Sequence, residues 1–442
     1  MYLKRSSAIA IAMAAAVAFV ILVSNISQAA KTLRISCDWN ENEPVYKWLE
    51  FAAKEFEKSH PGVKVTIQSE HRTFGQTVKQ RILAGDIPDV MDGWGFATST
   101  TALLEAVEAK ALFDLTKAME GKSHEGDSKW KDTFLPSLID SVKVKDKIWA
   151  MPFQYYTNVF HYNVAIFKKG GLKPPETWDE FTNILKKIKG MGISPLGKDI
   201  AYATTEFTPL EQRIVGPDAQ LAALKDPDLL KENPDFLKAL KMFKETFMSN
   251  YQPGYSGSQF PAAQMLFAQG KVAMMYMGTW LNSEIKGNTP PGFEMDVFRF
   301  PSIPGGKGIQ NLMVIGNCPN IVIPAGAQNT ELAVEWLKFI SSKKMVQAFV
   351  EQTTMLNGMR YSPMPAWAKS VRKVLEGGHV VSAEAYWQEE ARDINANLSK
   401  YMQEGNTLWF KFFAGEMGPE TYLDELIKLR KKAWDQLRKF GK

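Results

Sequence analysis

The chain has 442 residues, 45% of them hydrophobic, and its 53 Lys and Arg residues against 48 Asp and Glu residues give a formal net charge of +5. This length and composition predict two or three folded domains and exclude a disordered tail or a small disulfide-stabilised module. Charges of both signs alternate along most of the sequence, which disfavours a nucleic-acid partner.

Residues 1–29 have the pattern of a secretory signal peptide. Lys4 and Arg5 precede an uninterrupted apolar run over Ala8–Val23, and the small residues Ser27 and Ala29 suit a signal peptidase. A retained membrane anchor is the alternative, since the run is only slightly shorter than the roughly 20 residues that span a bilayer. We expect cleavage near Ala29 and, because no cysteine lies at this site, a free periplasmic protein.

Strands and helices alternate after this leader. Thr32–Cys37 has the pattern of a strand, a helix with apolar side chains at helical spacing covers Val45–Phe56, and Val63–Ile67 restores a period of two. A second helix through Val78–Leu83 and a short buried strand at Asp89–Met91 follow. This β-α-β-α-β order is typical of a parallel sheet covered by helices.

The same alternation continues in the later part of the chain. Thr177 and Glu180 form a capping box, because each side chain can accept a hydrogen bond from the backbone of the other, and a helix is predicted to begin there. A strand at Val272–Met277 leads into a short helix, and a helix over Ala333–Ile340 follows a strand at Ile321–Ile323. No repeat or low-complexity linker is present, so short ordered crossings should join the domains.

Four short motifs lie in a fixed order along the chain. They are AGDIPDV at 84–90, WAMPF at 149–153 with Tyr162-Asn163, KPPETWDEF at 173–181, and FAQGKVAMM at 267–275 with Gly278-Thr279-Trp280. In these motifs the chain resembles the family 1 extracellular solute-binding proteins, the group that includes maltose-binding protein and serves ABC sugar importers. The resemblance extends from the first strand to the C-terminal helices and is looser after Gly358.

The resemblance implies an α/β fold of the two-lobed periplasmic binding protein class, type II-like, in which a mainly parallel sheet flanked by helices forms each lobe. A ligand cleft lies between the lobes, and two or three crossings near Pro152, Phe300 and Ser342 act as a hinge. The implied N-terminal lobe comprises residues 30–151 and 299–342, and the C-terminal lobe comprises residues 152–298 and 343–442.

The resemblance also implies a function. The protein is expected to be the substrate-binding component of an ABC importer, which captures a mono- or oligosaccharide by lobe closure and delivers it to the permease subunits and their ATPase. A monomer without cofactor, metal or catalytic activity is expected, and neither the histidines nor the cysteines have the spacing of an ordinary metal site. A disulfide between Cys37 and Cys318 is permitted by export, but no spacing requires it.

A bound sugar needs an aromatic ring beneath its C–H face and carboxylates or amides around its hydroxyl rim. Aromatic residues make up 12% of the chain, and several follow strands, at the sheet edge where α/β folds bind ligands. The candidate ligand-binding residues are Trp39, Asn40, Glu41, His71, Arg72, Asp92, Trp94, Gln154, Tyr155, Tyr156, Trp280, Arg360 and Trp387. The alternatives are core packing for Trp280, a turn for Asp92, and a packing or surface role for the others.

Two other functions stay open from the sequence. The same fold could bind a charged solute, either a polyamine held by carboxylates or a glycerol phosphate ester held by Arg72 and Arg360. A glycan-active enzyme needs two carboxylates, for which Glu389-Glu390 and Asp424-Glu425 are candidates. Both pairs lie in charged helical stretches, where neighbouring acids are normally solvated, so binding without catalysis is the favoured prediction.

Overall fold

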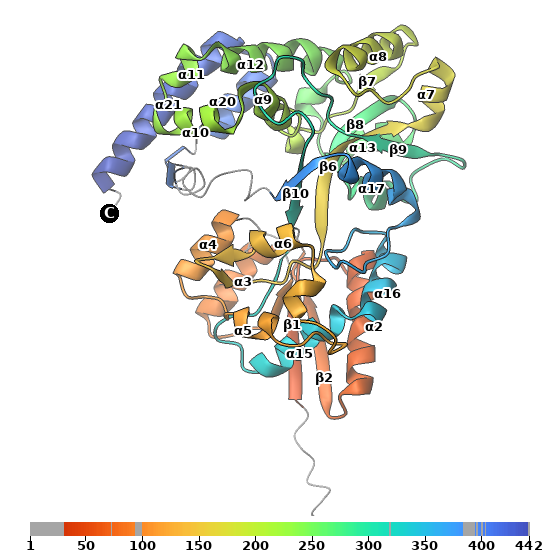
Figure 1. The fold of residues 1–442 in the computed structure, drawn as a ribbon, viewed down its shortest axis with the longest axis vertical. Coiled ribbons are helices and arrows are strands. Elements are labelled where there is room, and N and C mark those ends of the chain that lie inside the picture. Colours follow the sequence, from red (N-terminus) through yellow and green to blue (C-terminus); the bar gives the residue numbers. More distant parts are fainter. Residues whose placement is uncertain are drawn as a thin grey trace, which may run out of the picture.

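The chain folds into two lobes that are stacked along the long axis of the molecule (Figure 1). The computed structural model describes residues 31–440 apart from residues 72, 93–99, 318–319, 383–393, 395–396, 399–400 and 403. Each lobe has its own sheet, and a separate cluster of buried hydrophobic side chains surrounds each sheet. The two-lobed α/β architecture expected from the sequence is therefore confirmed.

The first lobe contains a four-stranded sheet of order β11-β3-β1-β2. Its strands are β1 (Lys31–Cys37), β2 (Val63–Ser69), β3 (Val90–Asp92) and β11 (Ile321–Val322). β1 pairs in parallel with β2 and β3, as the β-α-β-α-β pattern predicts, whereas β11 pairs antiparallel with β3. Strands contributed by distant parts of the sequence thus complete a single sheet.

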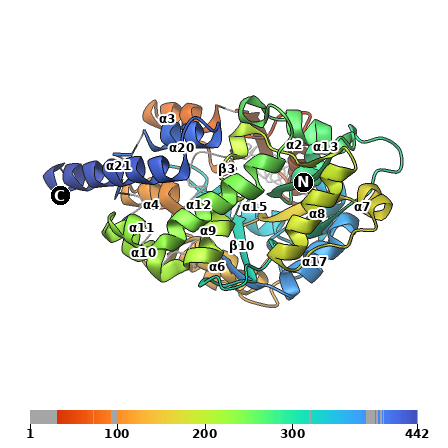
Figure 2. The ribbon, with the colours of Figure 1, turned by 90° about the horizontal axis from the view of Figure 1, so that it is seen from above.

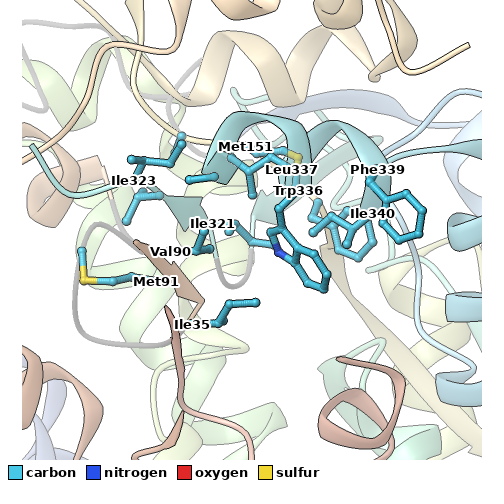
Figure 3. Close-up of a cluster of buried hydrophobic side chains, with 14 of the residues drawn as sticks. Ile35, Val90, Met91, Met151, Ile321, Ile323, Trp336, Leu337, Phe339 and Ile340 are labelled. Atoms are coloured by element: carbon cyan, nitrogen blue, oxygen red, sulfur yellow. The ribbon is translucent and has the colours of Figure 1, made fainter. Parts of the chain in front are cut away.

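Helices surround this first sheet. They are α2 (Pro44–Ser59), α3 (Phe74–Leu83), α4 (Thr100–Glu108), α5 (Thr116–Glu120), α15 (Thr330–Ile340) and α16 (Lys343–Thr353), with a small hairpin of β4 (Lys143–Val144) and β5 (Lys147–Ile148) and, at the boundary with the second lobe, α6 (Pro136–Ser141). Figure 3 shows Ile35, Val90 and Ile321 of the sheet beside Trp336 and Leu337 of α15. The apolar stripe of α15 predicted from the sequence is therefore the face that packs on the sheet.

The second lobe contains a six-stranded sheet of order β12-β10-β6-β8-β7, with β9 also paired to β6. Its strands are β6 (Tyr155–Asn163), β7 (Ser194–Leu196), β8 (Val272–Gly278), β9 (Met295–Phe298), β10 (Leu312–Asn317) and β12 (His379–Ser382). The central strand β6 runs antiparallel to β8, β9 and β10, while β7–β8 and β10–β12 are parallel pairs. This sheet is thus mixed, and the expectation of a mainly parallel sheet in each lobe was wrong for it.

Helices also cover the second sheet. They are α7 (Val164–Gly170), α8 (Trp178–Gly190), α9 (Phe207–Val215), α10 (Pro217–Lys225), α11 (Leu229–Glu232), α12 (Pro234–Thr246), α13 (Ala262–Ala268), α14 (Leu281–Ile285), α17 (Lys369–Glu376), α20 (Gly405–Phe413) and α21 (Pro419–Phe440). The capping box of Thr177 and Glu180 is present at the start of α8. The C-terminal helix α21 lies beside α11 and α12 and extends away from the lobe (Figures 1 and 2).

The chain crosses between the lobes three times, and only the first crossing lies where the sequence places it. After Phe153, which is part of the first core, the chain enters β6 of the second sheet. The second crossing runs from β10 to β11, and the third follows α16. In the part of the chain that is described, the crossings expected near Phe300 and Ser342 are thus displaced toward the C-terminus.

Tertiary packing explains both displacements. The ring of Phe300 lies 4.9 Å from the Arg213 guanidinium in the second lobe, and β10 completes the second sheet. In the first lobe, the Trp48 ring of α2 lies 5.0 Å from that of Phe349 in α16. Residues 299–317 therefore belong to the second lobe and α16 to the first, which corrects the boundaries expected from the sequence.

Candidate ligand-binding site

A cavity of about 680 Å³ lies between the lobes, beside the first and third crossings. This volume is within the range of roughly 300–1,000 Å³ that is usual for small-molecule sites. Its wall is formed by Trp39, Glu43, Pro44, Val45, Gln154, Tyr155, Tyr156, Tyr202, Thr279, Trp280, Ser283, Glu284, Thr353, Met355 and Leu356. Both lobes contribute aromatic and polar side chains to this wall.

Trp280 provides an indole ring on the second-lobe side of the cavity. It lies two residues after the end of β8 and directly before α14, and it is half-buried. Its ring lies against Gly278, where a Cβ atom would overlap the indole, so the missing side chain lets the ring fold back over the end of β8. The Tyr156 ring packs edge-on against it at 4.8 Å, and the Tyr202 ring lies at 6.5 Å. The three rings form an aromatic surface that can contact a flat ligand face.

The Tyr156 ring likewise packs against a glycine, here on a neighbouring strand. It is paired with Gly316 of β10 in the antiparallel register between β6 and β10. A Cβ atom at Gly316 would lie 2.6 Å from the Tyr156 ring, so a side chain there would displace the phenol from its position. A glycine on one strand thus sets the direction in which an aromatic ring of the next strand enters the cavity.

Trp39 provides the indole ring of the first lobe, and Asp92 holds it. Trp39 Nε1 donates a hydrogen bond to Asp92 Oδ2 at 3.3 Å, and Asp92 is 2% exposed at the end of β3. Burial raises the pKa of Asp92 to about 7; the hydrogen bond from Trp39 lowers this pKa and the charge of Asp38 raises it. Asp92 is not part of the cavity wall, so its role in this structure is to orient Trp39.

Two carboxylates lie on opposite sides of the cavity. Glu43, directly before α2, accepts a hydrogen bond from the Asn40 backbone N–H at 3.0 Å. Glu284 of α14 accepts one from Gln264 Nε2 at 2.7 Å. Although Glu284 is exposed through the opening of the cavity, protein surrounds much of it, and this desolvation raises its pKa to about 7 despite the bond from Gln264. The charges of Glu43 and Asp199 contribute to this raised pKa.

The structure places five of the thirteen candidate residues on the cavity wall. They are Trp39, Gln154, Tyr155, Tyr156 and Trp280. Three further candidates, Arg72, Trp94 and Trp387, lie outside the described residues. The remaining five are described but lie off the wall, which corrects the expectation that they line the cleft.

Local hydrogen bonds explain most of these corrections. Asn40 binds the loop backbone through its Oδ1, which accepts from the Asn42 N–H at 3.0 Å, and Glu41 is exposed to solvent. His71 Nδ1 lies 2.9 Å from the Asp38 carbonyl oxygen. Arg360 Nε donates to the Phe134 carbonyl oxygen at 2.9 Å, and the side chain lines smaller cavities beside the crossing. The fifth, Asp92, lies behind Trp39, as described above.

Sequence reasoning missed several residues of the wall. They are Glu43, Pro44, Val45, Tyr202, Thr279, Ser283, Glu284, Thr353, Met355 and Leu356. Glu284 follows Trp280 by one helical turn, and this spacing could have indicated that both face the same space. Tyr202 lies in a short 3-10 turn, Ile200–Tyr202, in a stretch without a motif, and only the packing of the second lobe brings it to the cavity.

The groups proposed for other chemistry lie away from this cavity. Asp424 and Glu425 of α21 form surface ion pairs with Lys231 and Lys428, as solvated helix residues do, and Glu389-Glu390 lies outside the described residues. Cys37 is buried, and burial raises the pKa of its thiol to about 12, while Cys318 lies outside the described residues. Among the described side chains, no group of His, Cys, Asp and Glu could hold a metal ion.

Comparison with known proteins gives relatives over most of the chain. The multiple sugar-binding protein of Streptococcus mutans is 24% identical over 364 residues, which cover 80% of this chain and 82% of that protein. A probable sugar-binding periplasmic protein of Rhizobium meliloti is 26% identical over 297 residues, covering 66% of this chain and 68% of that protein. Among solved structures, a chitin oligosaccharide binding protein has the same fold, with a TM-score of 0.73, 19% identity and coverage of 91% of this chain and 99% of that chain.

A family model also matches this chain. Within the described part of the chain, no helix has the length and apolar character needed to cross a bilayer. The model of the bacterial extracellular solute-binding proteins matches residues 38–347, a segment that includes β3 of the first sheet, β6 and β8 of the second, and most of the cavity wall. On this match, the chain belongs to the family of bacterial extracellular solute-binding proteins.

Proposed function

We propose that this protein is the substrate-binding component of an ABC importer and that its cavity binds a mono- or oligosaccharide. The observation that carries the proposal is a cavity between two lobes whose wall combines aromatic rings from both lobes with carboxylates, an amide and hydroxyl groups. Rings suit the C–H face of a sugar, and the polar groups suit its hydroxyl rim. The names of the related proteins, which are sugar-binding, support the same ligand class.

The arrangement of the wall supports capture by lobe closure. Trp39 and Glu43 belong to the first lobe, while Tyr202, Trp280 and Glu284 belong to the second, so a ligand contacts both sides only when the lobes approach each other. A ligand favours the closed state by its higher affinity for that state, and the permease then recognises the closed form. The solute leaves unchanged, and the protein acts as a monomer.

Export belongs to the same proposal. The signal peptide at residues 1–29 directs the chain to the periplasm, where it is removed near Ala29. The periplasmic name of the Rhizobium meliloti relative supports this location.

The phosphate-ester form of the charged-solute alternative receives less support from the site. A phosphate ester requires cationic groups, and the wall of the cavity contains no Lys, Arg or His among the described residues. Arg360, one of the two arginines on which that reading depended, binds the Phe134 carbonyl oxygen instead. The relatives' sugar-binding names agree with this preference.

A ligand screen tests the proposal. Thermal unfolding of the protein is followed with neutral oligosaccharides, polyamines and phosphate esters, since a ligand that binds only the folded state stabilises it by RT ln(1 + [L]/Kd). We expect a neutral sugar to stabilise the protein, and titration calorimetry measures the Kd of that sugar. Stabilisation by phosphate esters or polyamines alone would contradict the proposal.

The contribution of Trp280 gives a second test with the sugar identified by the screen. Replacing a central aromatic anchor by alanine commonly costs about 2 kcal/mol of binding free energy, so Trp280→Ala should raise Kd about 30-fold. Trp434→Ala is the matched control, because this half-buried indole of α21 donates to the Leu224 carbonyl oxygen at 2.9 Å and lies away from the cavity. An unchanged Kd in Trp280→Ala removes this residue from the site.

A further inference from the structure

The charge of the cavity wall is entirely negative among the residues that the structure describes. Glu43 and Glu284 are its charged side chains, and no Lys, Arg or His is present in the described wall. The two carboxylates come from different lobes, one preceding α2 and the other in α14. Above pH 7, where Glu284 is mainly ionised, a solute between the lobes therefore meets a carboxylate on each side.

Each carboxylate is fixed by a donor from its own lobe. Glu43 Oε2 accepts from the Asn40 N–H at 3.0 Å, and Glu284 Oε2 accepts from the Gln264 amide at 2.7 Å. Gln264 is 0% exposed in α13, so it holds Glu284 from behind. The Oε1 atom of each carboxylate has no hydrogen bond within the described part of the chain and is left for a ligand.

The charged groups that act on Glu284 do not compensate its charge. The groups that act on Glu284 through their charge are Glu43 across the cavity and Asp199 at the base of the turn that carries Tyr202, and both are acidic. A carboxylate accepts hydrogen bonds and donates none, so it pairs with hydroxyl or ammonium groups and repels another anion. The repulsion between a carboxylate and an anionic ligand is strongest where protein, rather than water, surrounds the two charges.

Building on the sugar-binding function proposed above, we propose that Glu43 and Glu284 select the charge of the sugar. They accept hydrogen bonds from neutral or amino sugars and exclude sugars that carry a carboxylate or a phosphate. Exclusion by like charge is a form of specificity that depends on disfavouring the wrong solute. An anionic sugar between the lobes faces repulsion from both sides, so it gains little from lobe closure.

The experiment uses oligosaccharides of two or three hexose units in three forms: neutral, with one uronic acid, and with one free amine. Titration calorimetry at pH 8 compares the wild-type protein with Glu43→Gln, Glu284→Gln and the double variant. We expect the uronic acid form to bind the wild type at least tenfold more weakly than the neutral form. The double variant should reduce this gap at least tenfold, because the amide keeps an acceptor oxygen without the charge.

Glu41→Gln is the matched control, since Glu41 is an exposed carboxylate in the same loop as Glu43 but lies off the cavity wall. It should leave the gap between the neutral and acidic forms unchanged. Equal affinity of the wild type for both forms, or a gap that survives in the double variant, overturns charge selection while the sugar-binding proposal stands. If none of the three forms binds, the sugar-binding proposal fails, and charge selection fails with it.

Discussion

A buried ion pair supports the turn that carries Tyr202, and its removal should be costly. Lys198 and Glu206 have side-chain exposures of 2% and 0%, and they form a salt bridge. Lys198 Nζ also donates to the Tyr202 carbonyl oxygen at 2.9 Å and to Thr205 Oγ1 at 2.6 Å. The ammonium thus binds three points of one turn, and the ring of Tyr202 lines the cavity.

The expected loss of unfolding free energy depends on which polar groups each variant leaves without a partner. Lys198→Met leaves the Glu206 carboxylate buried without its partner, for which the expected loss is about 3–5 kcal/mol of unfolding free energy. Lys198→Met with Glu206→Met removes both charges and the two hydrogen bonds from the ammonium to the Tyr202 carbonyl oxygen and the Thr205 hydroxyl, while the Thr205 N–H still donates to that carbonyl at 3.1 Å. At about 1 kcal/mol each, the double variant should lose roughly 2 kcal/mol.

The loss of stability in Lys198→Met should depend on pH. Burial lowers the pKa of Lys198 and raises that of Glu206, because desolvation disfavours both charged forms. In Lys198→Met, the carboxylate has lost its cation and takes up a proton as the pH falls, which removes the uncompensated charge. The penalty of the single variant should therefore decrease at acidic pH.

Urea denaturation followed by circular dichroism measures these losses at pH 7 and pH 5. The control is Lys231→Met, which breaks the exposed pair with Asp424, where both side chains are largely solvated, and should cost at most about 1 kcal/mol. A stabilising role of the Lys198–Glu206 pair is refuted if Lys198→Met costs no more than this control, or if the double variant is less stable than the single one.

Two further predictions concern the rings of the cavity. Gly278→Ala should raise the Kd for a bound sugar at least tenfold in titration calorimetry, because the new Cβ atom displaces the Trp280 ring; Gly257→Ala, with no atom within 4 Å of the new Cβ, is the control. The pKa of Asp92 is about 7 in the folded protein, against 3.8 for an unperturbed aspartate. Between these two pH values the folded state binds a proton that the unfolded state does not, so the unfolding free energy should fall as the pH rises from 4 to 7. Asp92→Asn should remove about 1.4 kcal/mol per pH unit of this slope in urea titrations, and an unchanged slope would contradict the assignment.

Local features of the fold could be predicted from the sequence. The β-α-β-α-β order of residues 31–92, the capping box at Thr177 and the strand-to-helix turn at Trp280 all appear in the structure. Each depends on the spacing of apolar residues or on hydrogen bonds between neighbours in sequence, and such interactions leave a pattern over a few residues. The motifs that resemble the family likewise indicate two lobes.

Long-range packing decided what the sequence could not indicate. β10 belongs to the second lobe because it pairs with β6 and β12, and α16 belongs to the first because Phe349 packs on Trp48. Glu43, Tyr202 and Glu284 are far apart in sequence, and only the stacking of two separately packed lobes brings them around one cavity. The hydrophobic effect is not directional, so an apolar segment is stabilised by burial against any surface of complementary shape. The packing of the whole core, rather than local residue spacing, therefore determines which segments contact each other.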